Sequence, residues 1–185
     1  MQSQRRPARY NENQVRAAAG ITMAAGTYAF VYAYFDKEFV PIKVVTTFFF
    51  IDFLIRVFGN LSYSPSGFVG GLLVRGRPPE WVSPEPKRFA WSIGLGMSFS
   101  MMLITNSNIT GVLPRTICLI CISLMWLESV IGFCAGCYVY ALGVRRGWVQ
   151  KKEGMVCAGG VCDVPARAPA PVEAAPQPLE VVHSS

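Results

Sequence analysis

Four long apolar segments constrain the fold of this chain more than any other feature of its sequence. They cover residues 15–35, 39–58, 89–109 and 116–144. A helix of about 20 apolar residues crosses the roughly 30 Å of hydrocarbon in a bilayer. The chain has 185 residues, of which 52% are hydrophobic and 15% charged, so little sequence is left for a soluble catalytic domain. We therefore expect an all-α, polytopic membrane protein whose domain at residues 15–146 is a bundle of four transmembrane helices.

The segments outside these spans have other compositions. Residues 1–14 form a basic N-terminal arm, and residues 147–185 form a Cys/Gly and then Ala/Pro-rich tail that we expect to be disordered. In the loop between the second and third spans, Ser64 and Pro65 suit the start of a short helix over 67–74 that would rest on the membrane surface. Prolines should then stop any helix before the third span: Pro78, Pro79, Pro84 and Pro86.

The basic residues beside the spans predict the orientation of the bundle. Most of them lie in the N-terminal arm, in the middle loop and at the start of the tail: Arg5, Arg6, Arg9, Arg16, Arg75, Arg77, Lys87, Arg88, Arg145, Arg146, Lys151 and Lys152. The positive-inside rule then places both termini in the cytoplasm, with the chain in the inner (plasma) membrane if the source is bacterial. The net charge of +6 is explained by this topology, and no nucleic acid partner is needed.

Three ionisable residues within the spans are candidates for a functional site. Asp52 and Arg56 are four residues apart in the second span and can pair, and Glu128 lies near the middle of the fourth span. Each would cost several kcal/mol if it faced lipid unpaired, so all three should point into the bundle. Either they form a polar clasp, in which Asp52 and Glu128 share Arg56, or they belong to an active site.

The six cysteines fall in the last third of the chain as three pairs: Cys118 and Cys121, Cys134 and Cys137, and Cys157 and Cys162. We interpret the first pair as structural, because free cysteine packs well in apolar surroundings. The second pair is flanked by small residues and lies at a depth similar to that of Arg56. If the two faces meet, Arg56 would favour the reactive thiolate form of Cys134 or Cys137.

Several of these residues belong to motifs that resemble a known family. The motifs are D-F-L-I-R at 52–56, Y-S-P at 63–65, P-K-R-F-A at 86–90, and L-E at 127–128 followed by G-F-C-A-G-C at 132–137. Together they resemble a bacterial four-helix membrane family, domain-of-unknown-function family 4395, over roughly residues 10 to 146. The resemblance implies an integral membrane domain without a settled activity. Its members look similar in outline to small membrane proteins encoded beside sulfur-transfer and thioredoxin-like proteins.

We expect a thiol-based redox or sulfur (persulfide) relay as the function, with the bilayer and a thioredoxin-like or sulfurtransferase protein as partners. Cys134 and Cys137 would carry the chemistry, Arg56 would set thiol acidity, and Asp52 or Glu128 would move protons. Because the pair is expected on the reducing cytoplasmic side, a reductant or a sulfur relay is favoured over an oxidant.

Two alternatives remain open from the sequence. The chain can be a non-enzymatic accessory subunit of a larger membrane complex, in which the motifs only fix helix contacts. It can also bind a soft metal, Cu(I) or Zn(II), through Cys134, Cys137, Cys157 and Cys162. The sequence names no cofactor and no substrate, and it leaves open whether the protein is an enzyme.

Overall fold

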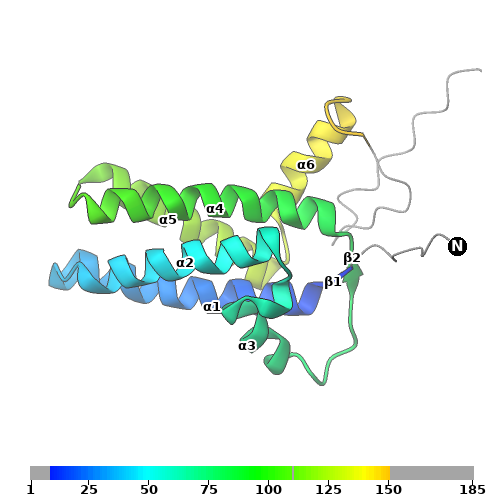
Figure 1. The fold of residues 1–185 in the computed structure, drawn as a ribbon, viewed down its shortest axis with the longest axis horizontal. Helices are drawn as coiled ribbons and strands as arrows, with labels where there is room; N and C mark the ends of the chain where they lie inside the picture. Colours follow the sequence, from blue (N-terminus) through cyan, green and yellow to red (C-terminus); the bar gives the residue numbers. More distant parts are fainter. Residues whose placement is uncertain (1–8, 110, 151–185) are drawn as a thin grey trace, which may run out of the picture.

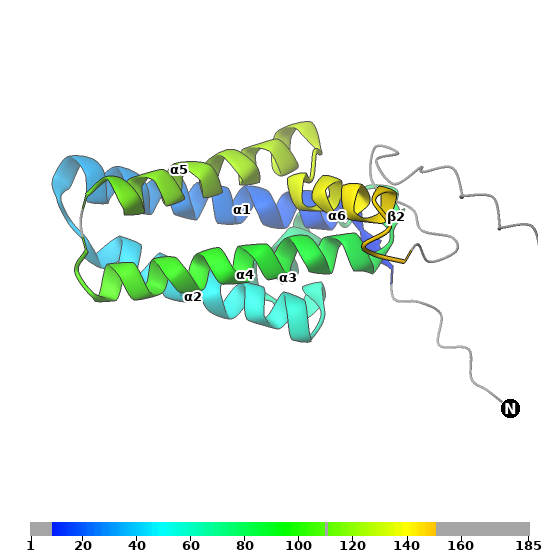
Figure 2. The same ribbon diagram turned by 90° about the horizontal axis from the view of Figure 1, so that it is seen from above.

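Long helices lie side by side along one axis and confirm the all-α fold (Figures 1 and 2). The structure is a computed structural model, which describes residues 9–109 and 111–150. The long helices within these residues are α1 (Glu12–Val31), α2 (Val40–Phe58), α4 (Pro84–Asn106) and α5 (Val112–Trp126). Both α1 and α5 continue into a wider π-helical turn, η1 (Tyr32–Asp36) and η3 (Leu127–Ile131).

The shorter elements gather at one end of the bundle, and the turns from α1 to α2 and from α4 to α5 lie at the other (Figure 1). These elements are β1 (Tyr10–Asn11), the 3-10 turn η2 (Leu61–Tyr63), α3 (Pro65–Leu73), β2 (Trp81–Val82) and α6 (Ala135–Arg145). β1 pairs with β2 in antiparallel fashion, with Tyr10 opposite Val82. We call this the α6 end of the bundle, and the other the turn end.

The short helix expected in the middle loop is present as α3, two residues longer at its start. The Ser64 Oγ accepts a hydrogen bond from the Gly67 N–H at 3.1 Å, as an N-cap does. A Cβ added at Gly70 would lie 2.9 Å from the backbone nitrogen of Ala18, so glycine allows α3 to pack directly on α1. α3 also exposes apolar side chains, among them Phe68 and Leu73.

Two expectations about where helices start are wrong. Pro84 and Pro86 do not stop a helix but lie in the first turn of α4, where a missing N–H costs nothing because that turn has no intrahelical acceptor for it. Residues 10–14, which were expected in the basic N-terminal arm, form β1 and the first turn of α1. The side chain of Asn11 caps α1 by accepting a hydrogen bond from the Asn13 N–H at 3.2 Å.

The fourth apolar segment is also not one helix over 116–144. Its helix ends at Ile131, Gly132 adopts a left-handed conformation with φ 79°, and α6 begins only at Ala135. The Arg16 Nη2 donates to the free carbonyl of Val130 at 3.0 Å, so a cation from α1 compensates the broken helical hydrogen bonds. The break turns α6 away from the axis of α5 (Figure 1).

Outside a small apolar core, burial in the bundle is inverted relative to a water-soluble protein. Apolar side chains along the helices are exposed, among them Val44 at 63% and Leu103 at 51%, whereas Asp52 is fully buried and Arg56 and Lys87 are each 2% exposed. Among the described residues, one helical stretch, Val112–Ile131, is long and apolar enough to cross a membrane. This stretch alone is a modest indication of membrane association.

The contact between α4 and α6 gives a prediction for Gly136. A Cβ there would lie 2.5 Å from the Ala90 Cβ and 2.7 Å from its Cα, so Gly136→Ala must push α6 away and should destabilise the protein by about 1–3 kcal/mol. Gly96→Ala is the matched control, since no atom lies within 4 Å of its added Cβ. Thermal unfolding followed by circular dichroism measures both variants. Equal stability of the two would contradict this packing.

Candidate functional site

Cys134 lies at the N-terminus of α6, directly after the helix break. Its Sγ is the N-cap group of α6 and accepts a hydrogen bond from the Cys137 N–H at 3.3 Å. Both thiols are buried, at 7% and 5% exposure. The free N–H groups of a helix N-terminus carry a partial positive charge, which favours a negative charge on sulfur. The pair was expected inside a continuous helix, and the break places Cys134 at a helix N-terminus instead.

Lys87 is a buried cation whose charge acts on this pair. Its Nζ lies 2.9 Å from the Glu12 Oε2 and 3.0 Å from the Glu128 Oε1. These contacts join α4, α1 and η3, and both Lys87 and Glu12 are 2% exposed. The charge of Lys87 also interacts with the thiols of Cys134 and Cys137. We call Glu12, Lys87 and Glu128 the lysine cluster.

The sequence did not identify two members of this cluster. Lys87 was read only as a marker of topology, and Glu12 was assigned to the basic arm. Their pairing joins residues 75 positions apart in the chain, so no local spacing could reveal it. One signal was available in the sequence. Lys87 belongs to the P-K-R-F-A motif, which is one of the motifs that resemble the family, and other motifs of the same set contain Glu128 and the cysteines.

Both Lys87 and Glu12 precede the apolar segments of their helices, and burial acts on each of them. Burial alone would lower the pKa of Lys87, but the charges of Glu128 and Glu12 outweigh it and raise that pKa above its ordinary value. Burial raises the pKa of Glu12, and the charge of Lys87 opposes this effect. The carboxylate partners of Lys87 therefore favour its charged form.

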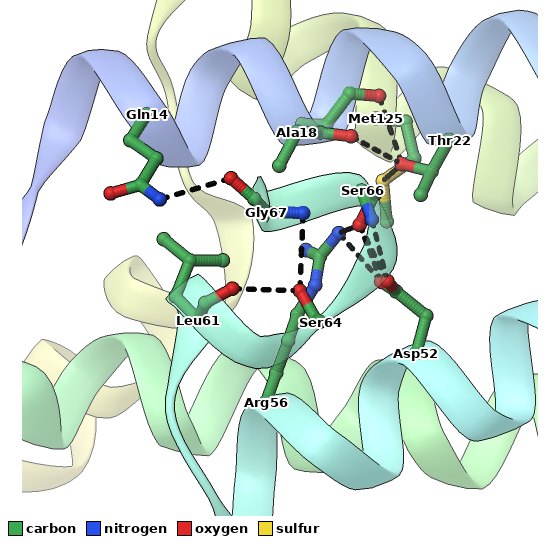
Figure 3. Close-up of polar contacts among 11 residues, drawn as sticks. Gln14, Ala18, Thr22, Asp52, Arg56, Leu61, Ser64, Ser66, Gly67 and Met125 are labelled. Carbon is green, nitrogen blue, oxygen red and sulfur yellow. Dashed lines mark hydrogen bonds and ion pairs between the residues drawn. The ribbon is translucent and has the colours of Figure 1, made fainter. Parts of the chain in front are cut away.

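Asp52 and Arg56 form a second cluster with Ser66 (Figure 3). The Arg56 Nη2 lies 2.8 Å from the Asp52 Oδ2 in the ion pair expected from their spacing. The Ser66 Oγ lies 2.7 Å from each oxygen of the Asp52 carboxylate, and the Ser66 N–H donates to Oδ1 at 3.0 Å. The same Oγ accepts a hydrogen bond from the Arg56 Nη2. This cluster joins α3 to α2.

The expected clasp, in which Asp52 and Glu128 share Arg56, is therefore wrong. Glu128 bonds to Lys87 instead, and its charge reaches Arg56 only at longer range. The guanidinium of Arg56 lies over the rings of Phe53 and Trp91, with centroid distances of 5.0 and 6.0 Å. Arg56 thus bonds within its own cluster through Nη2, and the cation whose charge acts on the thiols is Lys87 rather than Arg56.

A cavity of about 300 Å³ between the long helices reaches this site. Most of its lining is apolar, but Glu128 and three thiols also line it: Cys118, Cys121 and Cys134. The break after Ile131 brings the start of α6 to a cavity that the cysteines of α5 also face. Cys134 thus shares a cavity with Cys118 and Cys121, although the sequence kept the two pairs separate along one helix.

The soft-metal alternative is only partly addressed by the structure. Among residues 9–109 and 111–150, no group of three or more His, Cys, Asp or Glu side chains is placed to hold a metal ion. Cys157 and Cys162, which the alternative requires together with Cys134 and Cys137, lie outside the described residues. His183 lies outside them as well.

The lysine cluster predicts a dependence of stability on pH in the variant Lys87→Met. Without the charge of Lys87, burial and the charge of Glu128 would raise the pKa of Glu12 in the folded state further. A group with a raised pKa in the folded state loses its stabilising effect as pH rises through that value. We expect the free energy of unfolding of this variant to fall by about 3–5 kcal/mol at pH 8 and by clearly less at pH 5.

Thermal unfolding at both pH values measures this effect. Arg88→Met is the matched control, because Arg88 is the next residue, is exposed, and makes a single weak contact, with the Gly59 carbonyl at 3.3 Å. A loss in Lys87→Met that does not change with pH would show that the two carboxylates are not coupled through Lys87.

Comparison with known proteins now adds to this geometry. A model of the family described as Domain of unknown function (DUF4395) matches residues 10–145. No curated protein and no solved structure matches the chain significantly. The matched range contains the four long helices, both charge clusters and the Cys134–Cys137 pair. The chain therefore belongs to the DUF4395 family, as its motifs indicated.

Proposed function

We propose that this protein is an integral membrane thiol protein, in which Cys134 and Cys137 cycle between a dithiol and a disulfide. The observation that carries the proposal is the position of Cys134. Its sulfur caps the N-terminus of α6 and the charge of Lys87 acts on it. Two independent positive electrostatic effects therefore converge on one thiol pair, as reactive cysteines require.

The inverted burial supports a bundle of four membrane-spanning helices. A side chain such as Val44 or Leu103 is stable on the outside only if the surroundings are apolar, and the charges inside are paired as a membrane demands. Among the described residues, one helical stretch is apolar enough to be recognised alone. α2 carries three charged side chains, those of Lys43, Asp52 and Arg56. Two of these three charges, those of Asp52 and Arg56, neutralise each other inside the bundle.

The charge distribution supports a cytoplasmic location for the α6 end. Basic residues gather in the described segments at this end: Arg9, Arg16, Arg75, Arg77, Lys87, Arg88, Arg145 and Arg146. The turn end has Lys37, Lys43 and Arg115. The positive-inside rule then places the α6 end, and with it Cys134, on the cytoplasmic side of the plasma membrane.

The reaction that fits the pair is thiol–disulfide exchange with a thioredoxin-like or sulfurtransferase protein. The thiolate of Cys134 attacks a disulfide of the partner, that S–S bond breaks, and a mixed disulfide forms. The thiolate of Cys137 then attacks the Cys134 sulfur and releases the partner as a dithiol. Two electrons pass to the partner, and the Cys134–Cys137 disulfide is reduced again by a second cytoplasmic dithiol protein.

The two charge clusters have different roles in this proposal. Lys87 stabilises the thiolates, and Glu128, which faces the cavity and bonds to Lys87, accepts the proton that Cys137 loses. Asp52 and Arg56 are positioning residues, since they hold α3 and α2 together and do not contact the thiols. In the related persulfide relay, Cys134 would carry the transferred sulfur atom.

The test uses the full-length protein in nanodiscs with glutathione disulfide as the probe. We expect Cys137→Ser to accumulate a stable mixed disulfide between Cys134 and glutathione, because the resolving thiol is absent. Cys134→Ser should form none at Cys137, and Lys87→Met should form the Cys134 adduct about tenfold more slowly. Differential alkylation with peptide mass mapping measures each cysteine separately.

Cys118→Ser is the matched control and should behave as the unmodified protein. A gain of one sulfur atom on Cys134 after incubation with thiosulfate would select the persulfide relay. Thiols at Cys134 and Cys137 that stay inert under all of these conditions would overturn the proposal and leave the accessory-subunit interpretation.

A further inference from the structure

A second cavity, of about 260 Å³, is lined by residues of the turn end of the bundle. The turn end lies opposite the α6 end (Figures 1 and 2). The walls of this cavity come from α1 and η1, from the start of α2, and from the α4–α5 turn. Deep in it lie apolar groups such as Phe30, Ala33 and Ile42. Two cations, Lys37 and Arg115, line it as well. We call it the turn cavity.

The two cations face the same aromatic ring. The Lys37 Nζ lies 5.4 Å from the centroid of the Tyr34 ring, and the Arg115 guanidinium lies 5.1 Å from it. The Lys37 Nζ also donates to the Tyr34 carbonyl at 2.8 Å. Within the described part of the chain, neither cation forms an ion pair, although Asp36 and Glu38 flank Lys37 in the sequence. Two positive charges thus line one cavity, and no carboxylate of the described residues forms an ion pair with either.

The backbone adds to this positive potential. Phe39 and Gly111, which line the turn cavity, are the N-caps of α2 and α5. Neither helix has a side-chain cap or an acidic residue in its first turn. Their free N–H groups carry partial positive charge, which acts in the same direction as the two cations.

The turn cavity shares lining residues with the larger cavity of the bundle. Ile42 and Cys118 line both the turn cavity and the larger cavity that reaches the thiol pair. The two cavities therefore adjoin, and an extended apolar chain that outgrows the first can continue toward the second. A small anion would leave this apolar space unfilled.

We propose that the turn cavity binds an anionic lipid, with its acidic head group between Lys37 and Arg115 and its acyl chain among the helices. The negative charge of the head group pairs with the two cations. The acyl chain covers the apolar walls, and this burial is favourable by roughly 25 cal/mol per Å² of apolar area. A phospholipid with net negative charge and a free fatty acid share this chemistry. The proposal is independent of the thiol reaction at the α6 end.

Native mass spectrometry of the full-length protein in detergent tests the proposal with three probes: dioleoyl phosphatidylglycerol, dioleoyl phosphatidylcholine and oleate. We expect phosphatidylglycerol to bind in preference to phosphatidylcholine. The double variant Lys37→Gln/Arg115→Gln should bind phosphatidylglycerol roughly thirtyfold more weakly, from two cation contacts with an acidic lipid.

The double variant Arg75→Gln/Arg77→Gln is the control, because it removes the same charge from exposed positions at the α6 end and should bind as the unmodified protein. Ala33→Phe should weaken binding while leaving both cations in place, because it fills the apolar part of the cavity. Tight binding of oleate without phosphatidylglycerol would identify a fatty acid as the ligand. Equal binding of both phospholipids, or binding unchanged in Lys37→Gln/Arg115→Gln, would overturn the proposal.

Discussion

The ion pairs of Lys87 with Glu12 and Glu128 are the interaction on which the rest of the structure depends. Each of these groups would cost several kcal/mol if it were buried alone among apolar side chains. Their contacts of 2.9–3.0 Å leave little freedom for the helices that carry them. The start of α1, the start of α4 and the η3 turn are therefore fixed relative to one another at the α6 end, close to the cysteine pair.

The break after Ile131 connects this framework to the chemistry that we propose. In a continuous helix, the Cys134 sulfur would lie on a helix surface and its backbone would be fully hydrogen-bonded. The left-handed Gly132 and the Arg16 contacts with the Ser129 and Val130 carbonyls end that helix instead. A new helix N-terminus then begins at Cys134. The position of Cys134 at a helix N-terminus therefore results from backbone geometry rather than from a neighbouring acid or base.

Local patterns in the sequence predicted the parts of the fold that depend on local spacing. The apolar segments gave the long helices, Ser64 and Pro65 gave the start of α3, and the four-residue spacing of Asp52 and Arg56 gave their ion pair. The parts that were missed depend on distant partners. Arg16 stabilises a break 113 residues away, and Lys87 pairs with Glu128 across 41 residues. No period or motif reports such contacts, which arise only when the helices pack.

The most direct test of the account is the sidedness of the bundle in a membrane. In a background with all six cysteines replaced by alanine, Ser107→Cys places a thiol at the turn end and Gly76→Cys places one in the exposed loop at the α6 end. A membrane-impermeant maleimide added to intact bacterial cells should label the thiol at position 107 and should label position 76 only after the membrane is opened. Labelling of both positions in intact cells, or of neither before opening, would contradict a bundle that crosses the membrane with its thiol pair on the cytoplasmic side.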